Sequence, residues 1–348
     1  MYITSWQKLI PLAAAILFLF RAFQSSWAPH FTGSHYLASL HANISTSVED
    51  LPTPTNTPFS DVDQSLQPSA SLESNEPLET PDLTHTFDFI ISYYKEDTRE
   101  VRKKMAELKA LDAMKVYTRI RTFIYVKDEK ANLDELRMVF QTQNVFLIPN
   151  RGREAGAYFT HIINNWWDLA DHNLFMQAEL HHHDNARDKL VDYLRPNTGF
   201  LNIGFHEICS SEDCYDPWVK ERRFSRIQEI YTLVKQEFCP AQIAIDYLGQ
   251  IVVSRRRVQL NSRKIYQYLK DTLESEMDHP IHTDYHHENF QDTVENPYFG
   301  HTLERSYGIL WDCHYPRIAE TCGKGFGALV ARRGPGDTND DKCQCLDP

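Results

Sequence analysis

Short β-favouring runs alternate with segments of helical periodicity from residue 87 onward, and few folds accommodate that order. Strand and helix alternate four times, which predicts parallel strands joined by right-handed crossovers. The chain is therefore expected to form an α/β domain with a mixed, mainly parallel sheet flanked by helices. The predicted strands cover residues 87–93, 121–127, 145–149 and 173–178; the predicted helices cover 133–140 and 154–169, with another that begins after the capping box of Asp97 and Glu100.

This order is Rossmann-like up to residue 178, whereas the second part of the chain is less regular. Its predicted helices cover residues 223–238, 261–277 and 303–311, and a short strand covers 250–253. From residue 323 glycines, a proline and an acidic run follow. We expect a globular domain over 87–322 and a loose, cysteine-containing tail over 323–348.

An apolar run at residues 9–20 lies near the N-terminus, between Lys8 and Arg21. It has about a dozen residues, whereas a bilayer-spanning helix needs roughly 20 and a signal-peptide core about 7–15. Residues 1–28 are therefore expected to be a signal anchor, with a cleaved signal peptide or a buried soluble helix as alternatives. Residues 29–86, rich in Ser, Thr, Pro and acids, are predicted to be a disordered stalk.

All seven cysteines follow the apolar run, which favours a body that folds in an oxidising lumen. Cys209 and Cys214 are spaced to close a small ring, and Cys343 and Cys345 to reach back to the body. The odd count leaves at least one cysteine free or paired with another chain. With the glycosylation sequon at Asn43, these features predict a single-pass type II protein of the Golgi or ER membrane, or a secreted protein if the signal is cleaved.

The charge of the chain bears on its partners. It carries 36 basic and 48 acidic residues, a formal net charge of -12. Its basic residues are scattered, whereas nucleic-acid binding calls for a concentrated basic surface. We therefore expect no nucleic-acid partner.

Ligands of open parallel sheets bind beyond the carboxyl ends of the strands, so the residues there are candidates. After the first strand, Tyr93 and Tyr94 offer rings on which a nucleotide base can stack; the alternative is a turn with an N-cap. After the third strand, two guanidinium groups and a glycine precede a helix, which favours phosphate binding. The alternative is that Arg153 and Glu154 form ion pairs that brace the crossover. The phosphate-binding candidates are Asn150, Arg151, Gly152, Arg153 and Glu154.

Histidines and carboxylates follow the fourth predicted strand and suggest a divalent metal. Imidazole and carboxylate groups are ligands for manganese or zinc. The alternative is a solvated loop with one inward-pointing histidine, because adjacent residues rarely all face one ion. The candidate ligands are Glu179, His181, His183 and Asp184, and the residues assigned to an acceptor are Gln177, Ser254 and Arg255.

Several separated segments together resemble a mostly fungal family catalogued as domain of unknown function 3431. They lie at residues 150–158, 162–166, 175–177, 252–255 and 303–305. The likeness covers roughly residues 87 to 315. Because the family has no settled activity, the resemblance groups the chain without naming a reaction.

A second resemblance concerns the layout alone. A short tail, a signal anchor, a Ser/Thr/Pro stalk and an α/β body are similar to Golgi glycosyltransferases with the GT-A fold. In that fold the fourth strand typically ends in an acidic motif that holds a metal. Here that place carries Gln177, Ala178 and Glu179. Either Glu179 and a histidine hold a metal, or arginines neutralise the leaving phosphate.

These features predict a glycosyltransferase-like enzyme that transfers a sugar from a nucleotide donor to a glycan or glycoprotein. A non-catalytic lumenal carbohydrate-binding or scaffold protein and a metal-dependent hydrolase are the alternatives. Glu304 is the expected general base, oriented by Arg305, unless the two form a helix-capping ion pair. In that case the remaining acid–base candidates are Asp284, Glu288 and His301.

Overall fold

The computed structural model of the chain describes residues 85–217, 219, 222–283, 290–323 and 341–348. The predicted anchor, the predicted stalk up to residue 84, and the candidates Asp284 and Glu288 lie outside these residues. Within the described ranges, no helix combines the length and the apolar character needed to cross a bilayer.

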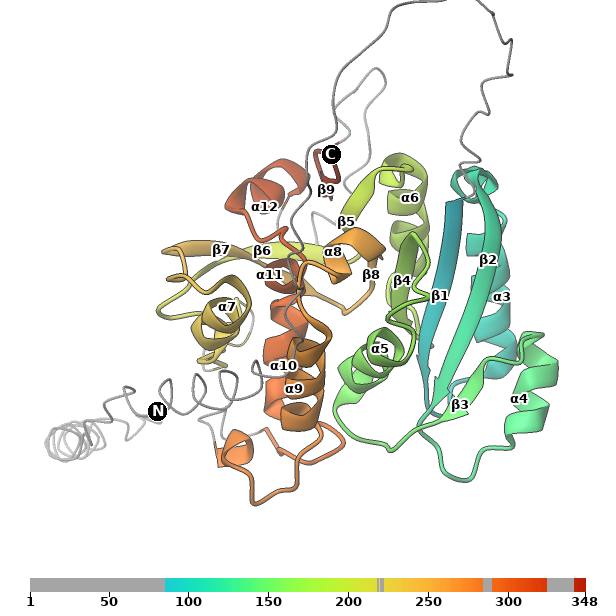
Figure 1. Ribbon diagram of the computed structural model, residues 1–348, viewed down its shortest axis with the longest axis horizontal. Coiled ribbons are helices and arrows are strands. Elements are labelled where there is room, and N and C mark those ends of the chain that lie inside the picture. The colour runs from blue at the N-terminus through green and yellow to red at the C-terminus, as the bar shows by residue number, and fades with distance from the viewer. Residues whose placement is uncertain (1–84, 218, 220–221, 284–289, 324–340) are drawn as a thin grey trace, which may run out of the picture. The chain divides into compact units, whose positions relative to one another are not determined.

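A seven-stranded mixed sheet forms the centre of the domain (Figure 1). Its strand order is β3-β2-β1-β4-β8-β5-β9. The first four strands of this order are parallel, and β8 pairs antiparallel with both β4 and β5. The strands span His85–Tyr93 (β1), Tyr117–Val126 (β2), Val145–Leu147 (β3), His172–Gln177 (β4), Thr198–Asn202 (β5), Ile251–Ser254 (β8) and Gln344–Leu346 (β9). The predicted α/β fold with a parallel core is confirmed.

Helices cover both faces of the sheet because successive strand residues point to opposite sides. Ile90 packs into one cluster, and its neighbours Phe89 and Ile91 pack into the other. The first cluster is completed by α5 (Arg153–Asn164), α8 (Arg255–Val258), α9 (Arg263–Leu273), α10 (Tyr298–Arg305) and α11 (Tyr307–Leu310). The second is completed by α3 (Thr98–Lys109), η1 (Asp112–Val116), α4 (Leu133–Phe140) and α6 (His183–Tyr193).

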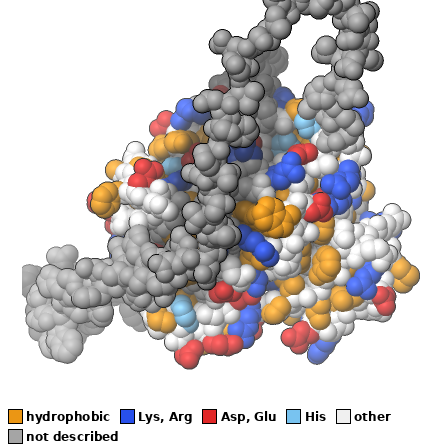
Figure 2. All heavy atoms as spheres, in the orientation of Figure 1, with side chains coloured by type: hydrophobic (Ala, Val, Ile, Leu, Met, Phe, Trp, Pro, Cys, Tyr) orange, Lys and Arg blue, Asp and Glu red, His pale blue; other side chains and the backbone are white. Residues whose placement is uncertain are grey.

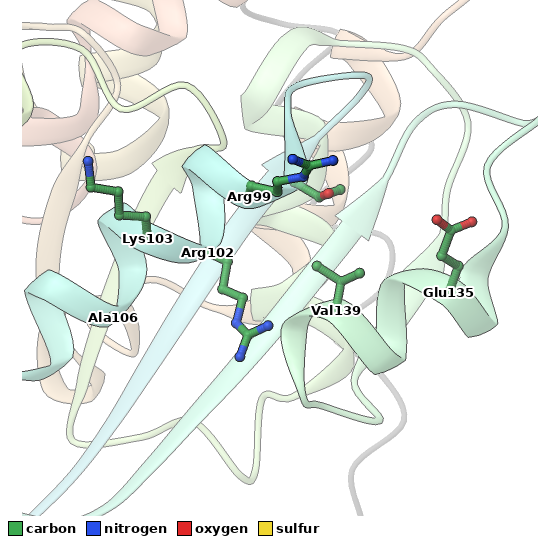
Figure 3. Close-up of a pocket in the computed structure, with 7 residues that line it drawn as sticks. Arg99, Arg102, Lys103, Ala106, Glu135 and Val139 are labelled. Carbon is green, nitrogen blue, oxygen red and sulfur yellow. The ribbon is translucent and has the colours of Figure 1, made fainter.

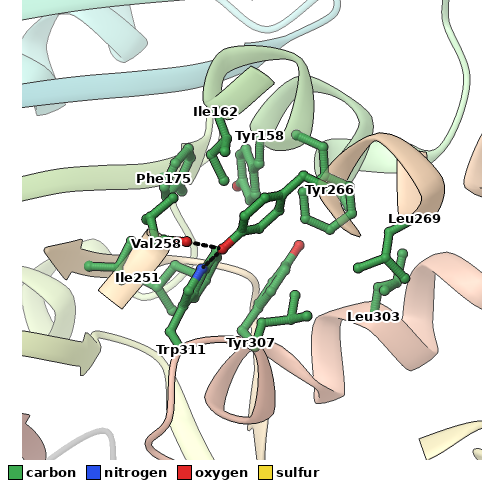
Figure 4. Packing of buried hydrophobic residues seen from close by; sticks show 14 of the residues in the cluster. Tyr158, Ile162, Phe175, Ile251, Val258, Tyr266, Leu269, Leu303, Tyr307 and Trp311 are labelled. Atoms are coloured by element: carbon green, nitrogen blue, oxygen red, sulfur yellow. Dashed lines mark hydrogen bonds between the residues drawn. The ribbon is translucent and has the colours of Figure 1, made fainter. Parts of the chain in front are cut away.

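Aromatic side chains fill the first cluster (Figure 4). The rings of Phe175 and Trp311 stack with centroids 5.9 Å apart. The indole N–H of Trp311 donates to the Tyr266 hydroxyl, which itself donates to the carbonyl of Val258 (3.1 and 2.7 Å). Because these buried polar atoms are satisfied, the core fixes α9 and α11 against the sheet.

A small second sheet carries part of the less regular half. It consists of β6 (Phe205–Ser210) and β7 (Gln242–Tyr247), which pair antiparallel. A third hydrophobic cluster joins it to α7 (Ile227–Lys235). The predicted small ring is confirmed by the disulfide between Cys209 and Cys214 at the end of β6.

Residues 344–346, within the segment predicted to be a loose, cysteine-containing tail, form strand β9 of the main sheet. Strand β9 pairs with β5 at the sheet edge, and Cys345 and Cys343 bond to Cys313 and Cys322. The remaining η2 (Pro280–Thr283) and α12 (Pro316–Cys322) are short. Cys239 forms no disulfide. Three disulfides indicate an oxidising compartment such as the secretory pathway.

Several predicted helices differ from those found. Helices α7 and α9 are shorter than the predicted 223–238 and 261–277. Helix α5 ends at Asn164 instead of residue 169. The single helix predicted over 303–311 is divided into α10 and α11, with Ser306 between them. The Ser306 hydroxyl donates to the carbonyl of Thr302 at 2.7 Å, a side-chain bond that competes with regular helix geometry. The break follows directly after Glu304 and Arg305.

Charged side chains are interspersed over the face seen in Figure 2. Acidic and basic groups alternate there among scattered hydrophobic ones, within the residues drawn in colour. This agrees with the even spread of charge along the sequence.

Candidate functional site

Lys127 connects the carboxyl ends of three parallel strands. Its backbone N–H donates to the carbonyl of Tyr93 at 2.8 Å, which ties the end of β2 to the end of β1. Its ammonium group donates to the carbonyls of Arg151 and Arg153, in the turn that follows β3. Burial lowers the pKa of Lys127 to about 8. This turn is therefore held at the sheet edge where ligands of such folds bind.

The turn into α5 has an unusual backbone. Gly152 (φ +65°) and Arg153 (φ 50°) both adopt the left-handed conformation. A Cβ at Gly152 would lie 2.7 Å from the Cγ of Leu273, so glycine is required there. An arginine in this conformation is uncommon, and strained residues of this kind gather at functional sites.

The side chain of Arg153 reaches α10. Its Nη1 lies 2.6 Å from Nε2 of His301, and its Nη2 lies 3.5 Å from Oε2 of Glu304. Its Nε donates to Oε2 of Glu154 at 3.3 Å. The structure thus brings predicted phosphate-binding residues together with the predicted catalytic pair. We call Arg153, Glu154, His301, Glu304 and Arg305 the ionic cluster.

Both carboxylate oxygens of Glu304 have neighbours. Oε1 accepts a hydrogen bond from the N–H of Leu248 at 2.8 Å and lies 2.8 Å from Nη1 of Arg305. Burial acts to raise the pKa of Glu304, but the guanidinium groups of Arg305 and Arg153 and the Leu248 N–H hold it below its usual value. Glu304 is therefore ionised.

Arg305 is held from several sides. Its guanidinium carbon lies 3.7 Å from the ring centroid of Tyr247, and its Nη2 lies 3.8 Å from Oδ2 of Asp216. Cation–π contact and ion pairing together offset the cost of burying this charge.

Two buried oxygens of the site have no hydrogen-bond partner among the described residues: Oε1 of Glu154 and the hydroxyl of Tyr307. Burial and then the Glu154 carboxylate raise the pKa of Tyr307 well above its usual value, so it stays protonated. Burial and then Arg153 lower the pKa of His301 to about 2, so the imidazole is neutral. Unpaired buried polar atoms beside fixed charges suit a polar ligand.

The ionic cluster lies near the end of β4 as well. A Cβ added at Gly249 would approach Oε1 of Glu154 to 3.1 Å, which places the turn before β8 against the cluster. The next residue, Gln250, donates its side-chain amide to the carbonyl of His181 at 2.9 Å. The cluster therefore adjoins the segment that follows β4.

The other predicted nucleotide-binding residues lie apart from the cluster. Tyr93 is buried against Phe140, with ring centroids 5.9 Å apart, and Tyr94 is exposed. The guanidinium group of Arg151 lies 2.7 Å from Glu276 and donates to the carbonyl of Glu274. The half-buried Asn150 precedes it in the turn. Arg151 thus braces the turn against the end of α9.

The four candidate metal ligands are not gathered around one point. Glu179 and His181 are exposed, whereas His183 lies 3.4 Å from Glu107 and 3.6 Å from Asp184. Among the residues that the structure describes, no three or more His, Cys, Asp or Glu side chains are arranged to hold a metal ion. The predicted ligand set does not fit a manganese or zinc ion in this arrangement.

The predicted acceptor residues are separated. The Ser254 hydroxyl donates to Oδ2 of Asp347 at 2.6 Å, and Arg255 pairs with Asp171 at 2.7 Å. Both contacts stabilise the C-terminal end of β8, whereas the ionic cluster adjoins the turn before its N-terminal end. Gln177 is half-buried at the end of β4.

Sequence patterns missed two residues of the site. Tyr307 lies inside the predicted helix 303–311, where its spacing from Leu303 and Leu310 indicates packing alone. Lys127 was expected to end a strand. No local pattern reveals either role, since both depend on contacts with distant segments.

A cavity of about 510 Å³ lies on the other face of the sheet, between α3 and α4 (Figure 3). Arg99, Arg102 and Lys103 line it from α3, and Glu135 and Val139 from α4. These charged side chains are exposed, and no predicted site residue lines the cavity. The ionic cluster is the stronger candidate site.

Comparison with known families matches residues 90–322 to proteins of unknown function, DUF3431. The chain belongs to DUF3431. The match agrees with the likeness expected over residues 87 to 315. It includes every member of the ionic cluster, so this DUF3431 domain carries the whole candidate site. No curated protein matches the chain.

Proposed function

We propose that this DUF3431 protein is a glycosyltransferase-like enzyme of the secretory pathway. It would transfer a sugar from a nucleotide donor to a glycan or glycoprotein acceptor. The observation that carries the proposal is the meeting of Arg153 and Glu154 with Glu304 at the carboxyl edge of the parallel strands.

The sheet topology supports this proposal. The order β3-β2-β1-β4 is that of a nucleotide-binding half, in which the crevice lies where the strand order reverses, between β1 and β4. The antiparallel strand β8 and the less regular half of the chain follow. The disulfides support a lumenal location, and the type II Golgi or ER orientation stays part of the proposal.

Each charged residue has a role in the proposed reaction. Arg153 compensates the charge that develops on the leaving diphosphate, because its guanidinium is the most exposed cation of the cluster (20% exposed). Glu154 accepts the proton of the acceptor hydroxyl through its unpartnered Oε1. Glu304, whose oxygens are both engaged, positions Arg153 and Arg305 in place of acting as the base.

The arrangement of carboxylates and histidines favours neutralisation by arginine over a protein-held metal. The candidate ligands after β4 do not converge, and the cations nearest the predicted leaving group are guanidinium groups. We therefore route no step through a metal.

A nucleotide-sugar turnover assay tests this function. The full chain is incubated with UDP-glucose, UDP-N-acetylglucosamine or GDP-mannose, and release of UDP or GDP is measured. We expect Glu154→Gln to lower the rate about 100-fold or more. The exposed helix residue Glu320 supplies the matched control, and Glu320→Gln should keep the wild-type rate. Release that is equal in wild type and Glu154→Gln would remove Glu154 from the mechanism.

A non-catalytic carbohydrate-binding role is the second candidate. It is favoured because the charges of the cluster already neutralise one another. Arg153 pairs with Glu154 and Glu304, and Arg305 pairs with Glu304. Sugar binding without any nucleotide affinity would support this alternative.

A further inference from the structure

A second pocket lies at the opposite end of β7 from the ionic cluster. It has a volume of about 240 Å³ and is lined by residues of α7 and by the segments around β7 and α12. Its lining includes Tyr231, Lys235, Gln242, Asp312, His314 and Tyr315. Gln242 begins β7 and Tyr247 ends it beside Arg305, so the strand separates the two sites by roughly 17–20 Å.

The lining of this pocket holds one cation and two carboxylates. The Lys235 ammonium lies 2.5 Å from Oδ1 of Asp312. Glu237, which also lines the pocket, adds a carboxylate that accepts the Tyr231 hydroxyl at 3.3 Å. No excess positive charge is left among these residues to hold a phosphate. The pocket therefore suits a neutral, hydrogen-bonding ligand.

His314 supplies a polar atom without a partner. Its side chain is buried (5% exposed), and its Nδ1 has no hydrogen-bond partner among the described residues. Burial and then Lys235 lower its pKa, so the ring is neutral and carries one donor and one acceptor nitrogen. A hydroxyl group both donates and accepts, and it satisfies Nδ1 in either tautomer.

Two aromatic rings pack against the His314 ring. Tyr315 (46% exposed) stacks on His314 with ring centroids 4.8 Å apart, and Tyr231 meets His314 edge-on at 5.2 Å. In the loop between Glu237 and Pro240, both of which line the pocket, Phe238 is 98% exposed. Sugar rings present C–H groups on one face and hydroxyls at their edge, which matches aromatic rings beside amide, carboxylate and imidazole groups.

We propose that this pocket binds a single neutral sugar ring, as a carbohydrate site separate from the ionic cluster. Its volume is below the ~300–1,000 Å³ of pockets for drug-sized ligands, which excludes a whole nucleotide sugar and fits one pyranose. Tyr315 forms the platform for the C–H face, and Gln242, Asp312 and His314 bind hydroxyls. The site does not depend on the proposed transfer reaction.

Ligand-observed NMR on the full chain tests this site, with methyl α-mannopyranoside and methyl N-acetyl-β-glucosaminide as probes. We expect saturable binding of at least one probe. Tyr315→Ala and Gln242→Ala, which change exposed residues, should each weaken it about tenfold or more. Trp167→Ala is the matched control, because Trp167 is an 88% exposed aromatic residue outside the pocket, and it should bind as the wild type does.

Competition distinguishes this site from the proposed active site. Saturating UDP should leave the binding of the sugar probe unchanged, whatever the turnover assay shows. Three results would overturn the proposal: neither probe binds the wild type, both pocket variants bind like the wild type, or UDP displaces the probe.

Discussion

The guanidinium group of Arg153 lies 3.5 Å from the carboxylate of Glu304, a residue 151 positions later in the chain. The contact joins the turn after β3 to the last residues of α10. It places a cation with two buried carboxylates at the edge of the sheet where nucleotide-binding folds hold their ligands. Two of the predicted site segments, the turn after β3 and helix α10, thus meet at one place.

Glu304 should matter for stability whatever its part in the reaction. Glu304→Gln removes the charge that compensates the buried guanidinium group of Arg305 and the half-buried one of Arg153, and we expect the free energy of unfolding to fall by about 3 kcal/mol. Urea denaturation of both proteins measures the change. Glu320→Gln alters an exposed helix residue and should stay within about 0.5 kcal/mol of the wild type. Equal stability of Glu304→Gln and the wild type would contradict the buried ion pair.

The C-terminal strand depends on a similar pair. Asp347 lies 2.9 Å from Nε of the buried Arg257 and also accepts the Ser254 hydroxyl. Asp347→Asn should lower the free energy of unfolding by about 1–3 kcal/mol, because it leaves a buried cation undercompensated. The control Asp112→Asn breaks an exposed pair with Lys115 and should cost less than about 1 kcal/mol. A neutral effect of Asp347→Asn would show that β9 contributes little to stability.

His301 should make the free energy of unfolding depend on pH. Its folded-state pKa of about 2 lies below its usual 6.5, chiefly because it is buried and then because Arg153 is near. Below pH 6.5 the unfolded chain binds a proton at this residue that the folded chain does not, so stability falls as pH falls. Between pH 7 and pH 5 the proton bound by the unfolded chain lowers the free energy of unfolding by about 2 kcal/mol.

His301→Gln keeps an acceptor for Arg153 and removes the titration. The loss of stability from pH 7 to pH 5 should therefore be smaller in this variant than in the wild type, by about 2 kcal/mol. Denaturant unfolding at the two pH values measures it. The same loss in both proteins would show that His301 is not held neutral.

The sequence predicted the parallel half of the fold well, because each of its elements has a local signal. The predicted apolar runs became β1 to β4, and Asp97 caps α3 by accepting from the N–H of Arg99. The ring between Cys209 and Cys214 follows from their short spacing. These features need no information about distant segments.

The remaining features depend on contacts that no local pattern encodes. Strand β9 has only three residues and lies in a polar segment, so no local pattern predicts it. It forms because it pairs with the edge of β5 and because two disulfides hold it in place. The hydroxyl of Ser306 divides the last predicted helix. Arg151 and Arg153 are two residues apart, yet one braces α9 and the other joins α10. Their local sequence context does not distinguish these two roles.

That difference between the two arginines gives the most direct test of the central claim. UDP and GDP are titrated into the full chain by calorimetry, with and without manganese, for the wild type, Arg153→Lys and Arg151→Lys. We predict that the wild type binds one of the nucleotides, that Arg153→Lys weakens this binding about tenfold because an ammonium lacks the planar fork, and that Arg151→Lys and manganese leave it unchanged. No affinity of the wild type for either nucleotide, or equal affinity of wild type and Arg153→Lys, would contradict the account.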